Sequence, residues 1–244
     1  MSVGSLNWTA YCLASNEYGE DKAAWAESIC KAIGGESYSP IADAPTWLQI
    51  LGSGVWTMLW TAFAAFIIAF LLGSLIGIMR TLPSKPLAFI GTCYVELFRN
   101  IPLIVQLFFW AFVFPQFLPL SMSTGSGEMV AGGWWQNILN DNPAIIGVFA
   151  LGLYTAARIA EQVRAGISTV SQGQKNAAFA IGLTQNQSYR YVILPVAYRI
   201  VWPTLTSEAM NVFKNSAVLF ALSVLNFFAY TKTMREETSQ DIVI

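Results

Sequence analysis

Long apolar stretches separated by short polar segments organise this chain. A charge-free apolar run covers residues 51–79, and further apolar stretches cover 101–118, 143–158 and 196–228, the last of them interrupted by polar residues. A helix needs about 20 mostly apolar residues to cross roughly 30 Å of hydrocarbon. The pattern therefore predicts an all-α membrane protein with about four visible spans.

The two ends of the chain read as polar tails around one membrane domain. Residues 1–50 carry eight charged side chains and lack the basic start and apolar stretch of a signal peptide. Residues 231–244 are charged and too short to cross a bilayer. We expect a polar extracytoplasmic tail at 1–50, a membrane domain at 51–230 and a charged tail at 231–244. The chain is then truncated after the fourth span, frameshifted there, or a variant with four spans.

The distribution of basic residues among the loops predicts the orientation of the chain in the membrane. Lys and Arg occur in segments 80–99 and 158–199, whereas the segment 119–142 contains none. Basic loops stay in the cytoplasm, so the N-terminus and the 119–142 loop are predicted to lie outside. Cys12 and Cys30 would then lie in an oxidising compartment, either as a disulfide or as two free thiols.

Composition excludes several classes of protein. The chain is 55% hydrophobic and only 11% charged, with a formal net charge of −1 and no His. Without a basic excess there is nothing to hold nucleic acid, and without His there is no Ser-His-Asp catalysis and no His-based metal site. No Gly-x4-Gly-Lys-Ser/Thr loop occurs, so the chain has no P-loop for ATP. We expect an integral membrane protein without catalytic or metal-binding residues.

A polar segment between the third and fourth spans carries two signals for helix starts. Ser171 and Gln174 have the spacing of a capping box, and so do Thr184 and Gln187. Gly182 lies between them, where a left-handed residue would end the first helix. We call residues 171–195 the elbow and expect a helix at 172–181, a tight turn, and a second helix reaching 194. Its first helix lies on the bilayer surface or docks a partner protein.

The fourth span has one polar face. At 100° per residue, four polar side chains fall within about 60° of each other and two more lie at the margin of this stripe. The stripe either lines a translocation pathway or forms a structural polar seam, because charged groups at mid-bilayer depth avoid lipid. The six candidate pathway residues are Thr204, Ser207, Glu208, Asn211, Lys214 and Asn215.

Charged residues also lie at the inner ends of the second and third spans. Anchoring of the spans at the interface is favoured over direct contact with a solute. An Arg99–Glu161 pair or a Glu96–Arg164 pair would also act as a cytoplasmic latch.

The elbow resembles the coupling loop of ABC-importer permeases. The residues Asn176-Ala177-Ala178, Gly182 and Val192-x-Leu194-Pro195 follow the spacing of Glu-Ala-Ala-x3-Gly-x9-Ile-x-Leu-Pro, with Asn in place of the acid and Val in place of Ile. Segments 96–106, 154–167 and 214–216 resemble polar amino-acid permeases, and residues 173–178 resemble the glutamate/aspartate type. The resemblance covers residues 56–225.

This resemblance implies a type I importer bundle that works with other chains. It implies a dimer of ATPase subunits that hold ATP and Mg, a second permease subunit, identical or homologous, and a periplasmic amino-acid-binding protein. It also implies a bacterial inner-membrane location and a fifth span, for which no apolar stretch is visible after residue 230. Contact with the ATPase is implied for Gln174, Asn176, Ala177, Ala178, Phe179, Gly182, Leu194 and Pro195.

The expected function is therefore the import of polar amino acids, and glutamate and aspartate are the favoured solutes. Competing classes are a secondary transporter or channel without an ATPase, and a membrane enzyme. A secondary transporter would show an internal repeat, and none is visible.

Overall fold

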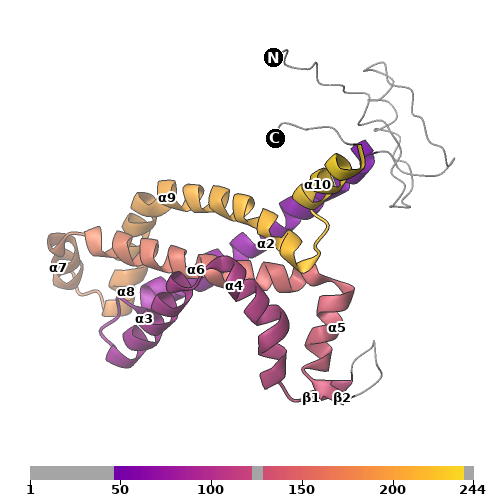
Figure 1. Cartoon of the computed structure of the whole chain (residues 1–244). Coiled ribbons are helices and arrows are strands. Elements are labelled where there is room, and N and C mark those ends of the chain that lie inside the picture. Colours follow the sequence, from indigo (N-terminus) through magenta and orange to yellow (C-terminus); the bar gives the residue numbers. More distant parts are fainter. Residues whose placement is uncertain (1–46, 123–128, 239–244) are drawn as a thin grey trace, which may run out of the picture. The chain divides into compact units, whose positions relative to one another are not determined.

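The computed structural model describes residues 47–122 and 129–238, which divide into two compact units. One unit contains residues 47–60 and 223–238, and the other contains Thr61–Leu222 (Figure 1). Of the predicted tails, residues 1–46 and 239–244 lie outside the described residues, and so do Cys12 and Cys30, whereas residues 231–238 are helical.

Helices dominate both units, which confirms the predicted fold class. Before the 119–142 loop, the elements are α2 (Trp47–Met79), α3 (Lys85–Asn100), α4 (Leu103–Phe108), a π-helical turn (Phe109–Val113) and a 3-10 turn (Phe114–Phe117). The following elements are β1 (Leu120–Met122), β2 (Met129–Ala131), α5 (Gly133–Asp141), α6 (Pro143–Thr169), α7 (Gln172–Ala180) and α8 (Gln185–Ser188). The last are a π-helical turn (Tyr189–Ile193), α9 (Leu194–Asn215), a 3-10 turn (Ser216–Leu222) and α10 (Phe227–Thr238).

The described residues contain two helices that are long and apolar enough to cross a membrane, α2 and α6. Two broken helices bring the number of candidate spans to at most four, in agreement with the predicted count. The predicted loop at 119–142 is more ordered than expected, because β1 and β2 pair antiparallel and α5 follows them.

The second predicted span is a helix broken at its start. The prediction began it at residue 101, but α3 precedes it and meets the following helical segment at 107°. Pro102 has no N–H to continue a helix, and the residue before a proline avoids helical geometry. The buried side chain of Gln106 donates hydrogen bonds to the carbonyl oxygens of Phe98 (2.8 Å) and Ile101 (2.9 Å). These two bonds satisfy backbone acceptors that the break leaves open.

The bounds of the third and fourth spans also differ from the prediction. Charged residues were taken to end the third span at 158, but α6 continues to Thr169 because those charges find partners inside the protein. Helical structure is continuous from Gln185 into α9, so the second elbow helix does not stop at residue 194. Pro195, which has no N–H to donate, lies directly after the π-helical turn at the point where α9 begins.

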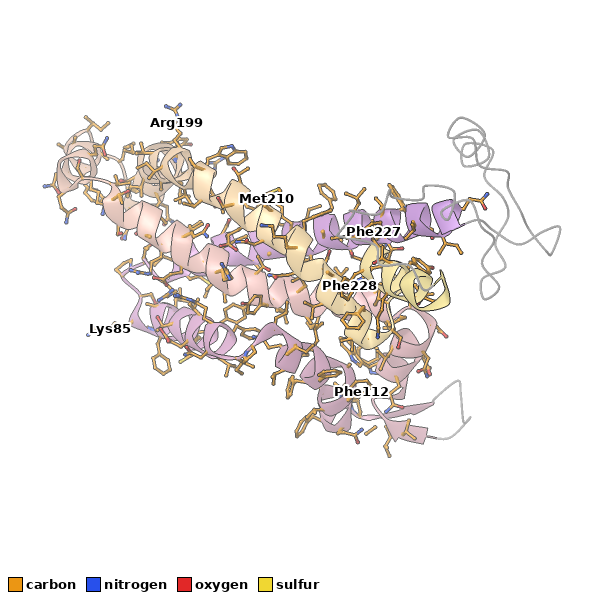
Figure 2. The ribbon with its side chains drawn as sticks, turned by 45° about the horizontal axis from the view of Figure 1, so that its top comes forward. Lys85, Phe112, Arg199, Met210, Phe227 and Phe228 are labelled. Atoms are coloured by element: carbon orange, nitrogen blue, oxygen red, sulfur yellow. The ribbon has the colours of Figure 1, made fainter. Side chains whose placement is uncertain are left out.

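Helix α6 is the centre of the larger unit. It packs against α9 on one side and α3 on the other (Figure 1). It also packs closely against α2, since a Cβ atom at Gly77 would lie 2.7 Å from the carbonyl oxygen of Ala160. Buried alanine, valine and isoleucine side chains fill these contacts. On the outer surface, Arg199 projects from α9 and Lys85 from α3 (Figure 2).

The smaller unit contains the first part of α2 and helix α10. Asn226 caps α10, because its side-chain oxygen accepts a hydrogen bond from the N–H of Ala229 at 3.0 Å. Val224, Tyr230 and Thr231 are buried.

Candidate functional site

A buried carboxylate interrupts the apolar face with which α9 packs onto the bundle. The other buried positions of this face include Val201, Leu205 and Val212, whereas Glu208 is only 5% exposed. Its Oε1 accepts hydrogen bonds from Arg158 and Gln162, each at 3.0 Å. Its Oε2 is also buried and has no hydrogen-bond partner. A buried charge requires an opposite charge, which Arg158 supplies.

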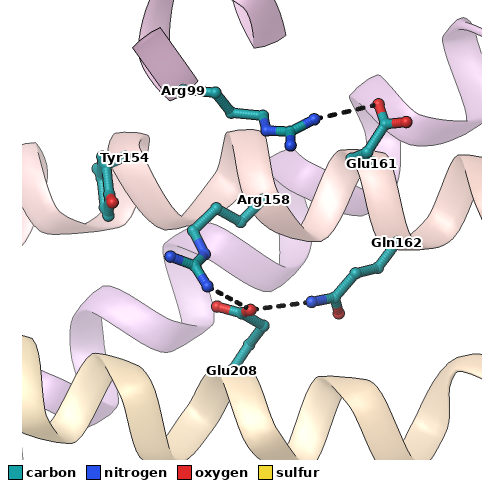
Figure 3. Close-up of a pocket in the computed structure, with 6 residues that line it drawn as sticks. All are labelled: Arg99, Tyr154, Arg158, Glu161, Gln162 and Glu208. Atoms are coloured by element: carbon teal, nitrogen blue, oxygen red, sulfur yellow. Dashed lines mark hydrogen bonds and ion pairs between the residues drawn. The ribbon is translucent and has the colours of Figure 1, made fainter. Parts of the chain in front are cut away.

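The partners of Glu208 line one stripe of α6. Tyr154, Arg158, Glu161 and Gln162 are separated by four, three and one residues, which places them on one side of a helix. With Arg99 and Glu208 they line a polar cavity of about 370 Å³. Figure 3 shows the side chains of Arg158 and Gln162 directed at Glu208, and Arg99 directed at Glu161. Helices α3, α6 and α9 therefore build this cavity together.

Glu161 is shared by three arginines. One oxygen bonds to Arg164 one helical turn later, and the other bonds to Arg80, which directly follows α2. Arg99 approaches the same carboxylate only to 3.9 Å, at the limit of an ion pair. The side chain of Arg80 is 10% exposed, whereas that of Arg99 is 47% exposed. Arg99 is therefore the arginine of this cluster that is most exposed and most weakly paired with Glu161.

The cavity suits a small solute that carries charges of both signs. Two guanidinium groups and two carboxylates line it, so the formal charges of its wall cancel. Guanidinium binds carboxylates with two parallel hydrogen bonds. The buried Oε2 of Glu208 has no hydrogen-bond partner and is a free acceptor for any ammonium group that reaches it. Among the described residues, no group of three or more Cys, Asp or Glu side chains is placed to hold a metal ion.

The structure brings one of the six predicted pathway residues into this cavity, Glu208. Thr204, Ser207 and Lys214 are exposed on the neighbouring side of α9, and Asn211 and Asn215 are partly buried. The six residues thus form a stripe along α9 that borders the cavity at Glu208. Contact of any of the six with a solute stays a prediction.

Of the two predicted latch pairs, the structure forms the one between Arg99 and Glu161. Among the described residues, Glu96 and Arg164 do not pair. The carboxylate of Glu96 accepts a hydrogen bond from Asn100 at 3.4 Å, and Arg164 binds Glu161 instead. The reason is geometric, because Arg164 lies one turn from Glu161 on the same helix.

The first helix of the elbow, its turn and the start of its second helix form as the sequence predicts. The Ser171 hydroxyl accepts a hydrogen bond from the N–H of Gln174 at 3.3 Å and starts α7. Gly182 has φ +85° and ends that helix, and Thr184 and Gln187 form a complete capping box at the start of α8. The predicted first helix, at 172–181, agrees with α7 to within one residue.

The surface of the elbow is apolar at two large side chains. Phe179 is 50% exposed and Ile181 is 76% exposed, although both are hydrophobic. Gln174, Asn176, Ala177 and Gly182 are also exposed, whereas Ala178 is buried and Leu194 is partly buried. Ala178 therefore holds the elbow against its own chain, and a partner protein would meet the other residues.

Three parts of the site were not predicted. The prediction treated Arg80 only as the end of a span, and Arg158 as an interface anchor without its partner Glu208. Tyr154 and Gln162 had no role as cavity residues. The spacing of Tyr154, Arg158 and Gln162 could have revealed this group, because a helix that continued past residue 158 would place the three side chains on one side. Nothing in the sequence places Arg80 beside Glu161.

The helical fold and the polar cavity are those of a membrane-spanning transport subunit. Comparison with known families shows which class of transporter this subunit belongs to. Residues 69–227 match the family model of the binding-protein-dependent transport system inner membrane component, and the chain belongs to this family. The glutamate/aspartate import permease protein GltJ of Escherichia coli (strain K12) is 46% identical over 186 residues, which is 75% of this chain and 72% of that protein.

Other relatives point in the same direction. The glutamate/aspartate import permease protein GltK of Escherichia coli O6:H1 is 30% identical over 80% of this chain and 82% of its own length. The solved structure of an amino acid ABC transporter with histidines superposes with a TM-score of 0.64 at 28% identity, over 80% of this chain and 81% of that one. The MetNI methionine ABC transporter gives a TM-score of 0.50 at 20% identity, over 78% of this chain and 96% of that one, and shares the fold. The chain is an amino-acid permease of the ABC-importer type, located in the inner membrane.

Proposed function

We propose that this chain is the permease subunit of an importer for acidic amino acids, with glutamate and aspartate as its solutes. The observation that carries the proposal is the polar cavity between α3, α6 and α9, where two guanidinium groups lie near two carboxylates. The 46% identity to a glutamate/aspartate import permease supports the same solutes.

The chemistry of the cavity fits a dicarboxylic amino acid. Arg99 is half exposed and only loosely paired, so one carboxylate of the solute replaces Glu161 as its partner. The second carboxylate binds beside Arg158, and the ammonium group donates to the unpartnered Oε2 of Glu208 once side chains move to uncover this buried atom. The charges of the solute are then paired with charges of the cavity wall, so no buried charge is left unpaired.

Energy for transport comes from separate ATPase subunits. A dimer of these subunits docks on the cytoplasmic elbow, where Phe179 and Ile181 are the exposed apolar anchors. ATP and Mg bind to those subunits, and this chain holds no cofactor of its own. Closure of the ATPase dimer moves the elbow and shifts the populations of the two access states.

Two further partners complete the importer. A second permease, identical or homologous, faces the polar stripe of α9, where Thr204, Ser207 and Lys214 are exposed. A periplasmic binding protein delivers the amino acid from outside, where the N-terminus also lies. In this arrangement the six stripe residues border the pathway that the two permeases share. Neither nucleic acid nor a catalytic residue takes part.

The test is solute uptake into vesicles that contain the complete transporter. We expect ATP-dependent uptake of glutamate and aspartate in large excess over glutamine. Arg158→Gln should reduce glutamate uptake about ten-fold or more, since a hydrogen bond to a charged group is worth about 1.5–3 kcal/mol. Arg199→Gln is the matched control, because Arg199 projects outward from α9 (Figure 2).

Two results would contradict the proposal. Equal uptake with and without ATP would indicate a secondary transporter or channel. A preference for neutral amino acids would refute the acidic solutes while leaving the importer class intact.

A further inference from the structure

A single side-chain hydrogen bond ties the elbow to a distant part of the chain. Tyr189 begins the π-helical turn between α8 and α9, and its phenol donates to the carbonyl oxygen of Thr81 at 2.7 Å. The two residues are 108 positions apart. Within the described part of the chain, no other side-chain hydrogen bond joins the elbow to the helices outside it. The Tyr189 ring itself packs on the apolar core between α6 and α9.

The turn that receives this bond is firmly held. Both the backbone N–H of Thr81 (2.9 Å) and its hydroxyl (2.8 Å) donate to the carbonyl oxygen of Ile78. The preceding residue, Arg80, donates from Nε to the Thr92 hydroxyl at 3.3 Å and binds Glu161 through its Nη1 atom. The end of α2 therefore connects the elbow to both α3 and α6.

The contacts continue from this turn to the polar cavity. Glu161 holds Arg80 and also faces Arg99, which lines the cavity. A displacement of Tyr189 pulls directly on Thr81, moves Arg80 with it, and changes how much of the Glu161 carboxylate is available to Arg99. Contiguous networks of this kind carry coupling when one element has two arrangements. The loose 3.9 Å contact of Arg99 is the element with room for a second arrangement.

We propose that Tyr189 is a positioning residue that links movement of the elbow to the Arg80–Glu161–Arg99 cluster, and so to solute binding in the cavity. The inference rests on the proposed docking of ATPase subunits on the elbow. Beyond that docking, the proposal assigns a specific hydrogen bond, from Tyr189 to Thr81, as the connection between the docking surface and the solute cavity. Tyr189 contacts neither the ATPase nor the solute in this scheme.

The chain offers a matched control in the same turn. Tyr191 is 62% exposed, and Arg190 lies over its ring at 5.7 Å from the centroid. Tyr191→Phe removes a hydroxyl of the same kind without touching the bond to Thr81. Tyr189→Phe removes that bond and keeps the ring in the core.

The experiment uses the complete transporter in vesicles and measures ATP hydrolysed per glutamate transported. We expect Tyr189→Phe to raise this ratio roughly five-fold or more, the lower range of allosteric coupling. Binding of the ATPase subunits should stay unchanged, and the melting temperature should change little. Tyr191→Phe should behave as the unmodified chain.

The possible results separate the two proposals. An unchanged ratio in Tyr189→Phe would overturn the link and leave the proposed function standing. Failure of the unmodified chain to bind ATPase subunits would overturn both. A large fall in the melting temperature of Tyr189→Phe together with an unchanged ratio in its folded fraction would assign the bond to stability and also refute the link.

Discussion

The elbow and the arginine cluster around Glu161 are built in opposite ways. The hydrogen bonds that start the two elbow helices join residues within a few positions of each other, as with Ser171 and Gln174 or Thr184 and Gln187. The cluster instead joins Arg80 to a carboxylate 81 residues away. The elbow is largely exposed, whereas the side chain of Arg80 is 10% exposed.

Because of this difference, substitutions in the elbow and in the arginine cluster should affect different properties, the docking surface and the stability of the helical bundle. A change in the elbow alters a surface that a partner reads and leaves the bundle intact. A change in the cluster leaves charges unpaired between helices and weakens the bundle itself. The following variants test that contrast, in order of decreasing expected effect.

Glu161→Ala should have the largest effect. It leaves the mostly buried side chain of Arg80 without its carboxylate, and losing hydrogen bonds between charged groups costs up to about 3 kcal/mol. Thermal unfolding of the purified chain in detergent measures this loss. Glu96→Gln is the control, because Glu96 is exposed and its recorded partner is the neighbouring Asn100. Equal melting temperatures for the two variants would show that Glu161 does not hold the helices together.

Glu208→Gln should have an intermediate effect, about 2 kcal/mol on stability, with a fall in glutamate uptake of about ten-fold. The amide keeps an acceptor for Arg158 and Gln162 but removes the negative charge that balances Arg158. A double variant that also carries Arg158→Gln should recover part of the stability, because the unpaired charge is then gone. Simple addition of the two single losses would show that the pair is not coupled.

Gly182→Ala should cost about 1–2 kcal/mol locally, since a side chain at φ +85° is strained even though nothing lies within 4 Å. Binding of the ATPase subunits should weaken several-fold while the melting temperature of the bundle hardly changes. Gly182→Asn should retain more binding, because Asn tolerates the left-handed region. Gly173→Ala is the control, as Gly173 lies inside α7 with ordinary helical geometry.

Thr184→Ala should have the smallest effect, about 1 kcal/mol on the start of α8, because it removes one half of the capping box. Hydrogen exchange at the N–H of Gln187 measures it, and that amide should exchange faster while α6 keeps its protection. Thr184→Ser should restore the slow exchange. Faster exchange throughout α6 would show that the elbow and the bundle are not separate in stability.

The same contrast explains what could be predicted from the sequence. The helix starts at Ser171 and Thr184 and the turn at Gly182 were visible because their signals are local. The approximate number of candidate spans followed from hydropathy alone. The Arg99–Glu161 pair was predicted from charges at the ends of two spans, and it forms.

The remaining features depend on tertiary contacts. The third span was predicted to end at Arg158, where the apolar stretch gives way to a polar one, yet α6 continues since Glu208 neutralises that charge. The break at Pro102 was read as the start of a span, because the pattern did not show that α3 precedes it at a steep angle. The partnership of Tyr189 with Thr81 has no signal in either residue.

The pairing of Arg80 with Glu161 also has a consequence for how the protein is made. A ribosome adds about 5–20 residues per second, so for roughly 4–16 s the emerging chain holds Arg80 without its counter-charge. During that interval lipid headgroups or the insertion machinery must shelter the guanidinium. The ion pair therefore forms only after α6 has been made, and the inner end of α2 is held in place well before the last helices of the chain emerge.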